Sequence, residues 1–211
     1  MANLQDLYTA VLEGDAELAT STTEAALKEG VDPKSIIDQY MIPAMDEVGR
    51  RFAANEYYVP ELLIAARSMK AALKLLKPLL ASSGAKPLAK VVIGTVKGDL
   101  HDIGKNLVAA MLEGGGFEII DLGVDVAPEK FIAAAKEKGA QLICLSALLT
   151  TTMGSMKEVV EQLKKEGLRH QVKVMIGGAP INQRFADEIG ADAYSDNASS
   201  AVTTARKLIA A

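Results

Sequence analysis

His101 is the side chain of this sequence best placed to do chemistry. It closely follows an apolar, β-branched run at 90–96, whereas the second histidine, His170, lies in a predicted loop. Asp99 precedes His101 by two residues, a spacing that permits a carboxylate–imidazole contact. Such a contact fixes the imidazole tautomer and makes the other ring nitrogen more basic. A single histidine cannot hold a bare zinc or iron ion, but it can be the axial ligand of a metal held in a macrocycle.

Small residues follow the other predicted strands. Ser146 and Thr150 close the third strand, Gly177 and Gly178 close the fourth, and Gly104 opens the first helix after His101. Glycines let a large ligand approach the backbone closely, and small hydroxyl side chains leave room while supplying hydrogen bonds. Together they predict a narrow slot that runs down into the sheet.

These residues sit in an alternation of strands and helices. Strands are expected at 90–96, 117–122, 141–148, 173–176 and 193–195. Helices are expected at 103–113, from about 128, and at 153–166, 181–189 and 198–210. This five-fold alternation predicts a flavodoxin-like (Rossmann-like), doubly wound, five-stranded parallel sheet. A ligand of such a sheet binds beyond the carboxyl ends of its strands.

The first 80 residues are predicted to be helical. Asn3, Asp15 and Asp32 each stand where a helix cap is expected, and Pro33 follows at the favoured first turn. Pro43 lies inside the third apolar stripe, so a kink or break is expected there. A fourth helix should run from position 60 to about 80. Four antiparallel helices with short turns predict a small bundle.

The fold class expected is therefore α + α/β, with an N-terminal four-helix bundle before the parallel sheet. The segment 82–88, which contains Ser-Ser-Gly-Ala-Lys-Pro, is predicted to be a linker. The domains expected are a helical bundle cap at 1–81 and a ligand-binding α/β domain at 89–211.

Composition excludes several classes of protein. The 211 residues are 49% apolar with a net charge of −4, and neither half has the basic excess of a nucleic-acid binder. The sequence contains no uninterrupted run of about 18 apolar residues, so no membrane span is expected. The N-terminus lacks the pattern of a secretory signal. A single cysteine, Cys144, cannot form an intramolecular disulfide, so a cytoplasmic location is expected.

The motifs together resemble a known family. Asp-x-His-x-x-Gly at 99–104, Ser-x-Leu at 146–148 and Gly-Gly at 177–178, separated by 41 and 28 residues, are similar to the signature of cobalamin-binding domains. Such domains occur in methionine synthase, carbon-skeleton mutases and methyltransferase corrinoid proteins. The resemblance implies that cobalamin, or a related corrinoid, binds base-off and histidine-on, with His101 as the cobalt ligand.

Further residue roles follow from the same resemblance. Asp99 and Thr152 are the carboxylate and hydroxyl of the relay behind His101; the best-known members have serine at the position of Thr152. The cofactor-binding residues implied are Gly98, His101, Asp102, Ile103, Gly104, Ser146, Leu148, Thr150, Gly177 and Gly178.

The resemblance extends to the helical part. The segment 52–62 is similar to the cap of methyl-transferring members, in which a bundle covers the reactive face of the corrin. It implies that Phe52 and Val59 shield the methyl group, because an apolar lid excludes water. A lid must move aside for a partner, so hinge motion is expected near 82–88.

The function that the resemblance implies is a methyl carrier in one-carbon metabolism. Cobalt would receive a methyl group from a substrate-specific methyltransferase and deliver it to an acceptor methyltransferase that uses tetrahydrofolate or a thiol. A reductive activating protein is a further expected partner; nucleic acid and membrane are not. The donor (a methylamine, a quaternary amine, methanol or a methoxy-arene), the final acceptor, the lower base of the native corrinoid and the oligomeric state stay open.

Two alternatives belong to other classes. One is a cobalamin-dependent sensor or light-responsive regulator, whose cap supplies a histidine or tryptophan to the cofactor, and residues 1–80 contain neither. The other is the small subunit of a cobalamin-dependent mutase, which lacks a preceding bundle.

Overall fold

The computed structural model describes residues 3–83 and 86–210. The chain divides into two compact units, and each is described by itself. A helical unit holds the chain up to Pro87 together with Glu113–Gly116, and a sheet unit holds Leu88–Leu112 and the chain from Phe117 onward. The predicted linker and hinge at 82–88 fall partly on Gly84 and Ala85, which lie outside the described residues.

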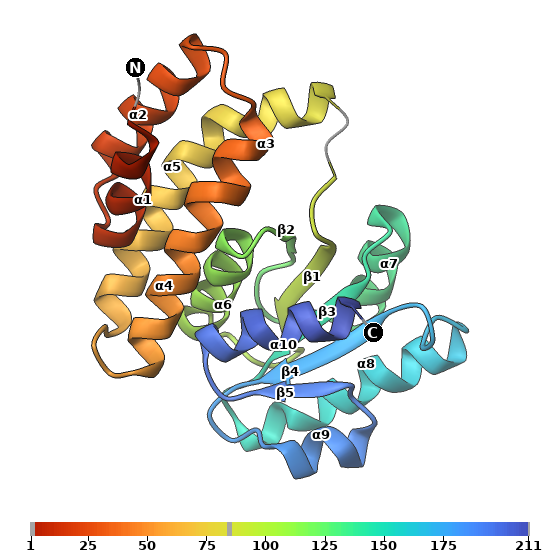
Figure 1. Ribbon diagram of the computed structural model, residues 1–211. Helices are drawn as coiled ribbons and strands as arrows, with labels where there is room; N and C mark the ends of the chain where they lie inside the picture. The colour runs from red at the N-terminus through yellow and green to blue at the C-terminus, as the bar shows by residue number, and fades with distance from the viewer. Residues whose placement is uncertain (1–2, 84–85, 211) are drawn as a thin grey trace. The chain divides into compact units, whose positions relative to one another are not determined.

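The first three helical segments of the helical unit each begin with a side-chain cap. Figure 1 shows the course of these helices. Asn3, Asp15 and Asp32 accept hydrogen bonds from backbone N–H groups of the turns that follow them, as predicted. The α-helices are α1 (Leu4–Glu13), α2 (Ala16–Lys28), α3 (Pro33–Ile36), α4 (Ile42–Ala53) and α5 (Val59–Ser83).

Pro43 does not break the third helical segment. A π-helical turn, Ile37–Met41, joins α3 to α4, and the N–H of Ile42 donates to the carbonyl of Ile37, five residues back. Proline has no N–H and its ring crowds the carbonyl four residues earlier, so an extra residue in the turn relieves both conflicts. Because α3, the π turn and α4 run on as one irregular helix, residues 3–83 form four helical segments, as predicted.

Buried side chains from every segment form the core of the helical unit. Met41, Met45 and Met69 are at most 2% exposed, which agrees with a gap-filling role. The hydroxyl of Ser68 on α5 is also buried, 3.0 Å from the carbonyl of Ala10 and 3.1 Å from that of Asp15. It ties the turn between α1 and α2 to α5.

The sheet unit has the predicted topology. Its five strands, all within residues 86–210, pair in parallel in the order β2-β1-β3-β4-β5, the flavodoxin-like order. The strands are β1 (Lys90–Thr95), β2 (Glu118–Asp121), β3 (Leu142–Ser146), β4 (Lys173–Gly177) and β5 (Ala193–Ser195). The helices are α6 (Ile103–Gly114), α7 (Pro128–Lys138), α8 (Met153–Lys165), α9 (Gln183–Ile189) and α10 (Ala198–Ala210).

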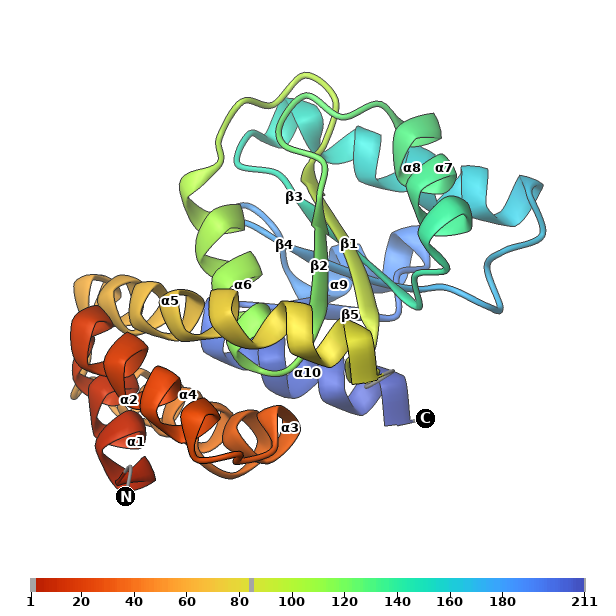
Figure 2. The ribbon, with the colours of Figure 1, turned by 90° about the horizontal axis from the view of Figure 1, so that it is seen from above.

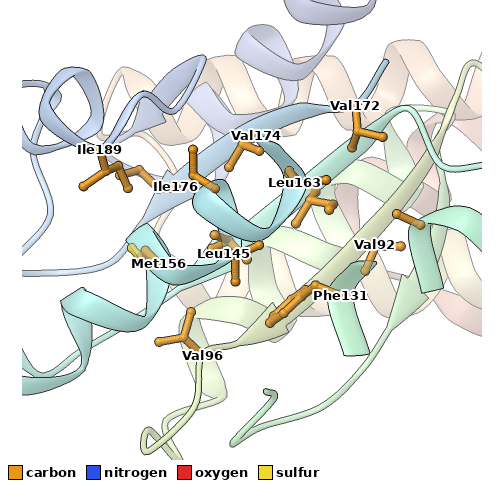
Figure 3. Packing of buried hydrophobic residues seen from close by; sticks show 14 of the residues in the cluster. Val92, Val96, Phe131, Leu145, Met156, Leu163, Val172, Val174, Ile176 and Ile189 are labelled. Carbon is orange, nitrogen blue, oxygen red and sulfur yellow. The ribbon is translucent and has the colours of Figure 1, made fainter. Parts of the chain in front are cut away.

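Alternate residues of each central strand serve opposite faces of the sheet. Val92, Ile143 and Val174 join one apolar cluster with Phe131 of α7 and Leu163 of α8 (Figure 3). Their neighbours in sequence face α6 and α10, which cover the other side (Figure 2). This period of two, with both faces buried, is what a doubly wound sheet requires.

Cys144 follows Ile143 in β3 and therefore points to the opposite face of the sheet. It is 4% exposed, and burial raises the pKa of its thiol well above the usual range. The thiol is therefore an inert part of the core rather than a nucleophile.

The third strand is shorter than predicted. The sequence indicates a strand at 141–148, but β3 ends at Ser146. After Ala147 the chain leaves the ladder, because the N–H groups of Leu148 and Leu149 donate to a carboxylate instead of to a neighbouring strand. Apolar composition alone cannot signal this exchange of partners.

None of the helices in residues 3–83 and 86–210 combines the length and apolar character needed to cross a membrane.

Gly178, directly after β4, has no room for a side chain. A Cβ atom there would lie 1.9 Å from the carbonyl oxygen of Ala147, and the backbone φ is +134°. At Gly104, in contrast, an added Cβ would meet nothing within 4 Å.

We therefore expect Gly178→Ala to lower the free energy of unfolding by at least about 2 kcal/mol, because the overlap is with backbone and the φ is unfavourable. Gly104→Ala is the matched control and should change it by less than about 1 kcal/mol. Urea unfolding of the cofactor-free protein measures both. A Gly178→Ala variant as stable as the control contradicts this account of the packing.

Candidate functional site

The loop after β1 turns back at Gly98, whose φ of +83° is in the left-handed region. In the residues that follow, Asp99 is buried and His101 is exposed. The buried hydroxyl of Thr95, the last residue of β1, donates to the carbonyl of His101 at 2.8 Å. The loop is thereby tied back to the strand that it leaves.

Asp99 is fully buried and is the hub of the site. Its Oδ1 is 2.7 Å from Nδ1 of His101 and accepts the backbone N–H of His101 at 3.1 Å. Its Oδ2 accepts the N–H groups of Leu148 and Leu149, at 2.8 and 3.2 Å, and the hydroxyl of Thr152 at 2.8 Å. The predicted contacts of Asp99 with His101 and Thr152 are both present.

These donors keep Asp99 ionised. Burial by itself raises the pKa of the carboxyl group, but the hydrogen bonds from Leu148, His101 and Thr152 outweigh burial and bring the pKa well below its usual range. An ionised carboxylate can only accept hydrogen bonds. The Nδ1 of His101 must therefore carry a proton.

A neutral imidazole with its proton on Nδ1 has its lone pair on Nε2. The side chain of His101 is half exposed, and in the described part of the chain Nε2 has no hydrogen-bond partner. The described residues bring together no group of three or more acidic, histidine or cysteine side chains that could hold a bare metal ion. The arrangement suits one axial bond to a metal that arrives with its other ligands.

Several apolar side chains near His101 in the sequence, or in the loop that binds Asp99, are exposed. Leu100 and Ile103, on either side of His101 in the sequence, are 71% and 78% exposed, and Leu148 and Leu149 are 43% and 42% exposed. Large apolar groups gathered on a surface mark a binding site. Together with the open space at Gly104, they favour a ligand that presents apolar surface to this loop.

The pairing of the strands brings the small residues together. Thr95, Ser146, Gly177 and Ser195 occupy one row across β1, β3, β4 and β5 at their carboxyl ends. Gly178 follows directly, and Thr150 is exposed in the 3-10 turn Thr150–Thr152. Small residues therefore line the carboxyl ends of these strands, where the ligand is expected.

The remaining predicted residues lie in different places. Asp102 is exposed beside His101 and accepts a hydrogen bond from the side chain of Asn106. Phe52, at the end of α4, is partly buried, and Val59, at the start of α5, is 41% exposed. Both belong to the helical unit, so their place over a cofactor stays a prediction.

Two features of the site escaped the sequence analysis. The backbone N–H groups of Leu148 and Leu149 stabilise Asp99, but a backbone donor leaves no mark in residue type. Asp125, after β2, accepts the N–H of Gly98 at 2.7 Å. Its position after a strand, at the edge where the ligand is expected, is a signal that could have identified it.

Comparisons with known proteins agree with this geometry. Residues 89–203 and residues 4–77 match two family models, each described as a B12 binding domain. Dimethylamine corrinoid protein 1 of Methanosarcina acetivorans is 45% identical over 98% of this chain and 97% of its own length. Trimethylamine corrinoid protein 1 of the same organism is 43% identical, over 95% and 94%.

A solved structure is similar over the same range. The methanol:cobalamin methyltransferase complex MtaBC of Methanosarcina barkeri has a TM-score of 0.87 and 31% identity, and the match covers 98% of this chain and 79% of that chain. The chain therefore belongs to the B12-binding corrinoid proteins of methyltransferase systems, and cobalamin is its cofactor.

Proposed function

We propose that the chain binds cobalamin base-off, with Nε2 of His101 as the lower ligand of cobalt, and carries a methyl group between a substrate-specific and an acceptor methyltransferase. The observation that carries the proposal is the 2.7 Å contact between the buried Asp99 carboxylate and Nδ1 of His101. It leaves the lone pair on Nε2 of a side chain that is half exposed, and the neighbouring residues Leu100 and Ile103 are exposed and apolar.

Each residue of the site would have a distinct task. Asp99 holds the proton on Nδ1 and keeps the ring oriented, which makes Nε2 a stronger donor. Thr152, Leu148 and Leu149 hold Asp99 in its ionised state. Gly104 and the row of small residues leave space for the ligand, and Phe52 and Val59 would exclude water from its reactive side.

When bound, cobalamin supplies a cobalt atom that can accept a methyl group and release it to a nucleophile. Two relatives named for methylamines favour this carrier over the sensor and the mutase that the sequence left open. We infer that the donor is a small methylated compound selected by the partner. Tetrahydrofolate or a thiol is the acceptor we propose, and a reductive activating protein completes the system.

The ligand assignment predicts a protein nitrogen on cobalt. Chain labelled with ¹⁵N-histidine and loaded with unlabelled cobalamin should show, by electron paramagnetic resonance of the Co(II) form, a doublet splitting from the axial nitrogen. The cofactor's own ¹⁴N base would give a triplet.

His101→Ala should lose the doublet, and the exposed His170→Ala should keep it as the matched control. A triplet in the labelled wild-type protein would falsify the proposed lower ligand.

The relay predicts a specific role for the hydroxyl of Thr152. Thr152→Val keeps the shape but removes a hydrogen bond to a buried carboxylate, so we expect unfolding of the cofactor-free protein to cost roughly 1–3 kcal/mol less. Thr152→Ser retains the hydroxyl and should lie within about 1 kcal/mol of wild type. Equal stability of the two variants in urea unfolding would show that the hydroxyl does not support Asp99.

The carrier role can be tested with known partners. The chain loaded with cobalamin and reduced with titanium(III) is mixed with the methyltransferases for dimethylamine, trimethylamine or methanol and the matching substrate. We expect at least one pair to methylate the bound cofactor, observed by its absorption spectrum, with His101→Ala much slower. Failure of every pair, when each methylates its own corrinoid protein, would contradict this set of donors.

A further inference from the structure

Asp125 lies in the loop between β2 and α7 and has an unusual backbone. Its φ is +52°, and among the described residues the other non-glycine residue with a positive φ is Asn55. Aspartate and asparagine tolerate this conformation better than other side chains, but it persists only where neighbouring contacts hold it. Such contacts are present on both sides of Asp125.

Asp125 makes two hydrogen bonds with the loop after β1, which carries His101. Its carboxylate Oδ1 accepts the N–H of Gly98 at 2.7 Å, and its own N–H donates to the carbonyl of Asp99 at 3.0 Å. Gly98 and Asp99 are the two residues at which this loop turns toward His101. The side chain of Asp125 is exposed, so its hydrogen bond to Gly98 is not a by-product of core packing.

The rest of the β2–α7 loop is anchored to the sheet. The N–H of Val126 donates to Thr95, and the carbonyl of Gly123 accepts the N–H of Thr95. The N–H of Gly123 in turn donates to Asp121, whose carboxylate pairs at 2.5 Å with the buried Lys105 of α6. These contacts fix the loop that carries Asp125 to the sheet.

We propose that Asp125 is a positioning residue for the lower ligand: it fixes Gly98 and Asp99, and through them the direction of the His101 imidazole. This rests on the proposed binding of cobalt by His101. The position needs both a left-handed backbone and a short acceptor, and aspartate and asparagine provide both. Glycine would provide the backbone alone.

Three substitutions separate these requirements. Asp125→Asn keeps the backbone preference and the acceptor. Asp125→Gly keeps the backbone and removes the acceptor, and Asp125→Glu displaces the acceptor by one methylene group. Asn55→Gly is the matched control, because it relaxes the same kind of backbone in the helical unit.

The first measurement uses the protein without cofactor. Hydrogen exchange of the Gly98 amide should accelerate about tenfold or more in Asp125→Gly and stay within about twofold of wild type in Asp125→Asn. The ¹⁵N shifts of the His101 ring should move in Asp125→Gly and remain unchanged in Asn55→Gly. If Asp125→Gly does not fold, Asp125→Glu should show the same changes.

The second measurement uses cobalamin. Loss of a group that orients a metal ligand typically costs about 10- to 100-fold in affinity, so Asp125→Gly should bind cobalamin at least about tenfold more weakly, with rescue by Asp125→Asn. Wild-type affinity and unchanged His101 signals in folded Asp125→Gly would overturn the role of Asp125. If His101→Ala keeps the axial nitrogen signal, the proposed ligand itself fails, whatever Asp125 does.

Discussion

The site depends on one buried charge. Asp99 is an anion with no exposed surface, and an unpaired charge in that position would be prohibitively costly. Donors from two loops, including the imidazole of His101, make it tolerable. The hydrogen bond from Nδ1 of His101 stabilises the Asp99 carboxylate. The same hydrogen bond holds the proton on Nδ1 and so leaves the lone pair on Nε2 available.

The parallel sheet explains why these donors can converge. The carboxyl ends of β1, β3 and β2 lie at one edge, since neighbouring parallel strands all run in the same direction. The loop after β1 brings Asp99 and His101, the loop after β3 brings Leu148 and Thr152, and the loop after β2 brings Asp125. These loops meet because β1 lies between β2 and β3, so the site is a property of the topology as well as of the motif.

Sequence reasoning succeeded where a residue type dictates its own role. Asn3 and Asp15 indicated where helices start, and apolar runs that alternate with helical stretches indicated the parallel sheet. Both signals depend on local chemistry. It failed where a backbone group changed partner: the N–H of Leu148 leaves the ladder for Asp99, so the strand at 141–148 was drawn too long. The sequence predicts a kink or a break at Pro43, but it does not indicate the π turn that keeps the helix continuous there.

The exposed apolar residues around His101 complete the physical picture. Leu100 and Ile103 are more than two-thirds exposed, an arrangement that contributes nothing to the stability of the sheet unit alone. Their burial beneath cobalamin would recover hydrophobic free energy that the cofactor-free fold forgoes. Any ligand that binds only the folded chain also stabilises it by mass action. In the proposed binding mode, cobalamin would cover this apolar surface, and its binding would offset the free-energy cost of exposing that surface beside the imidazole. The stability of this edge of the sheet would then be coupled to its function.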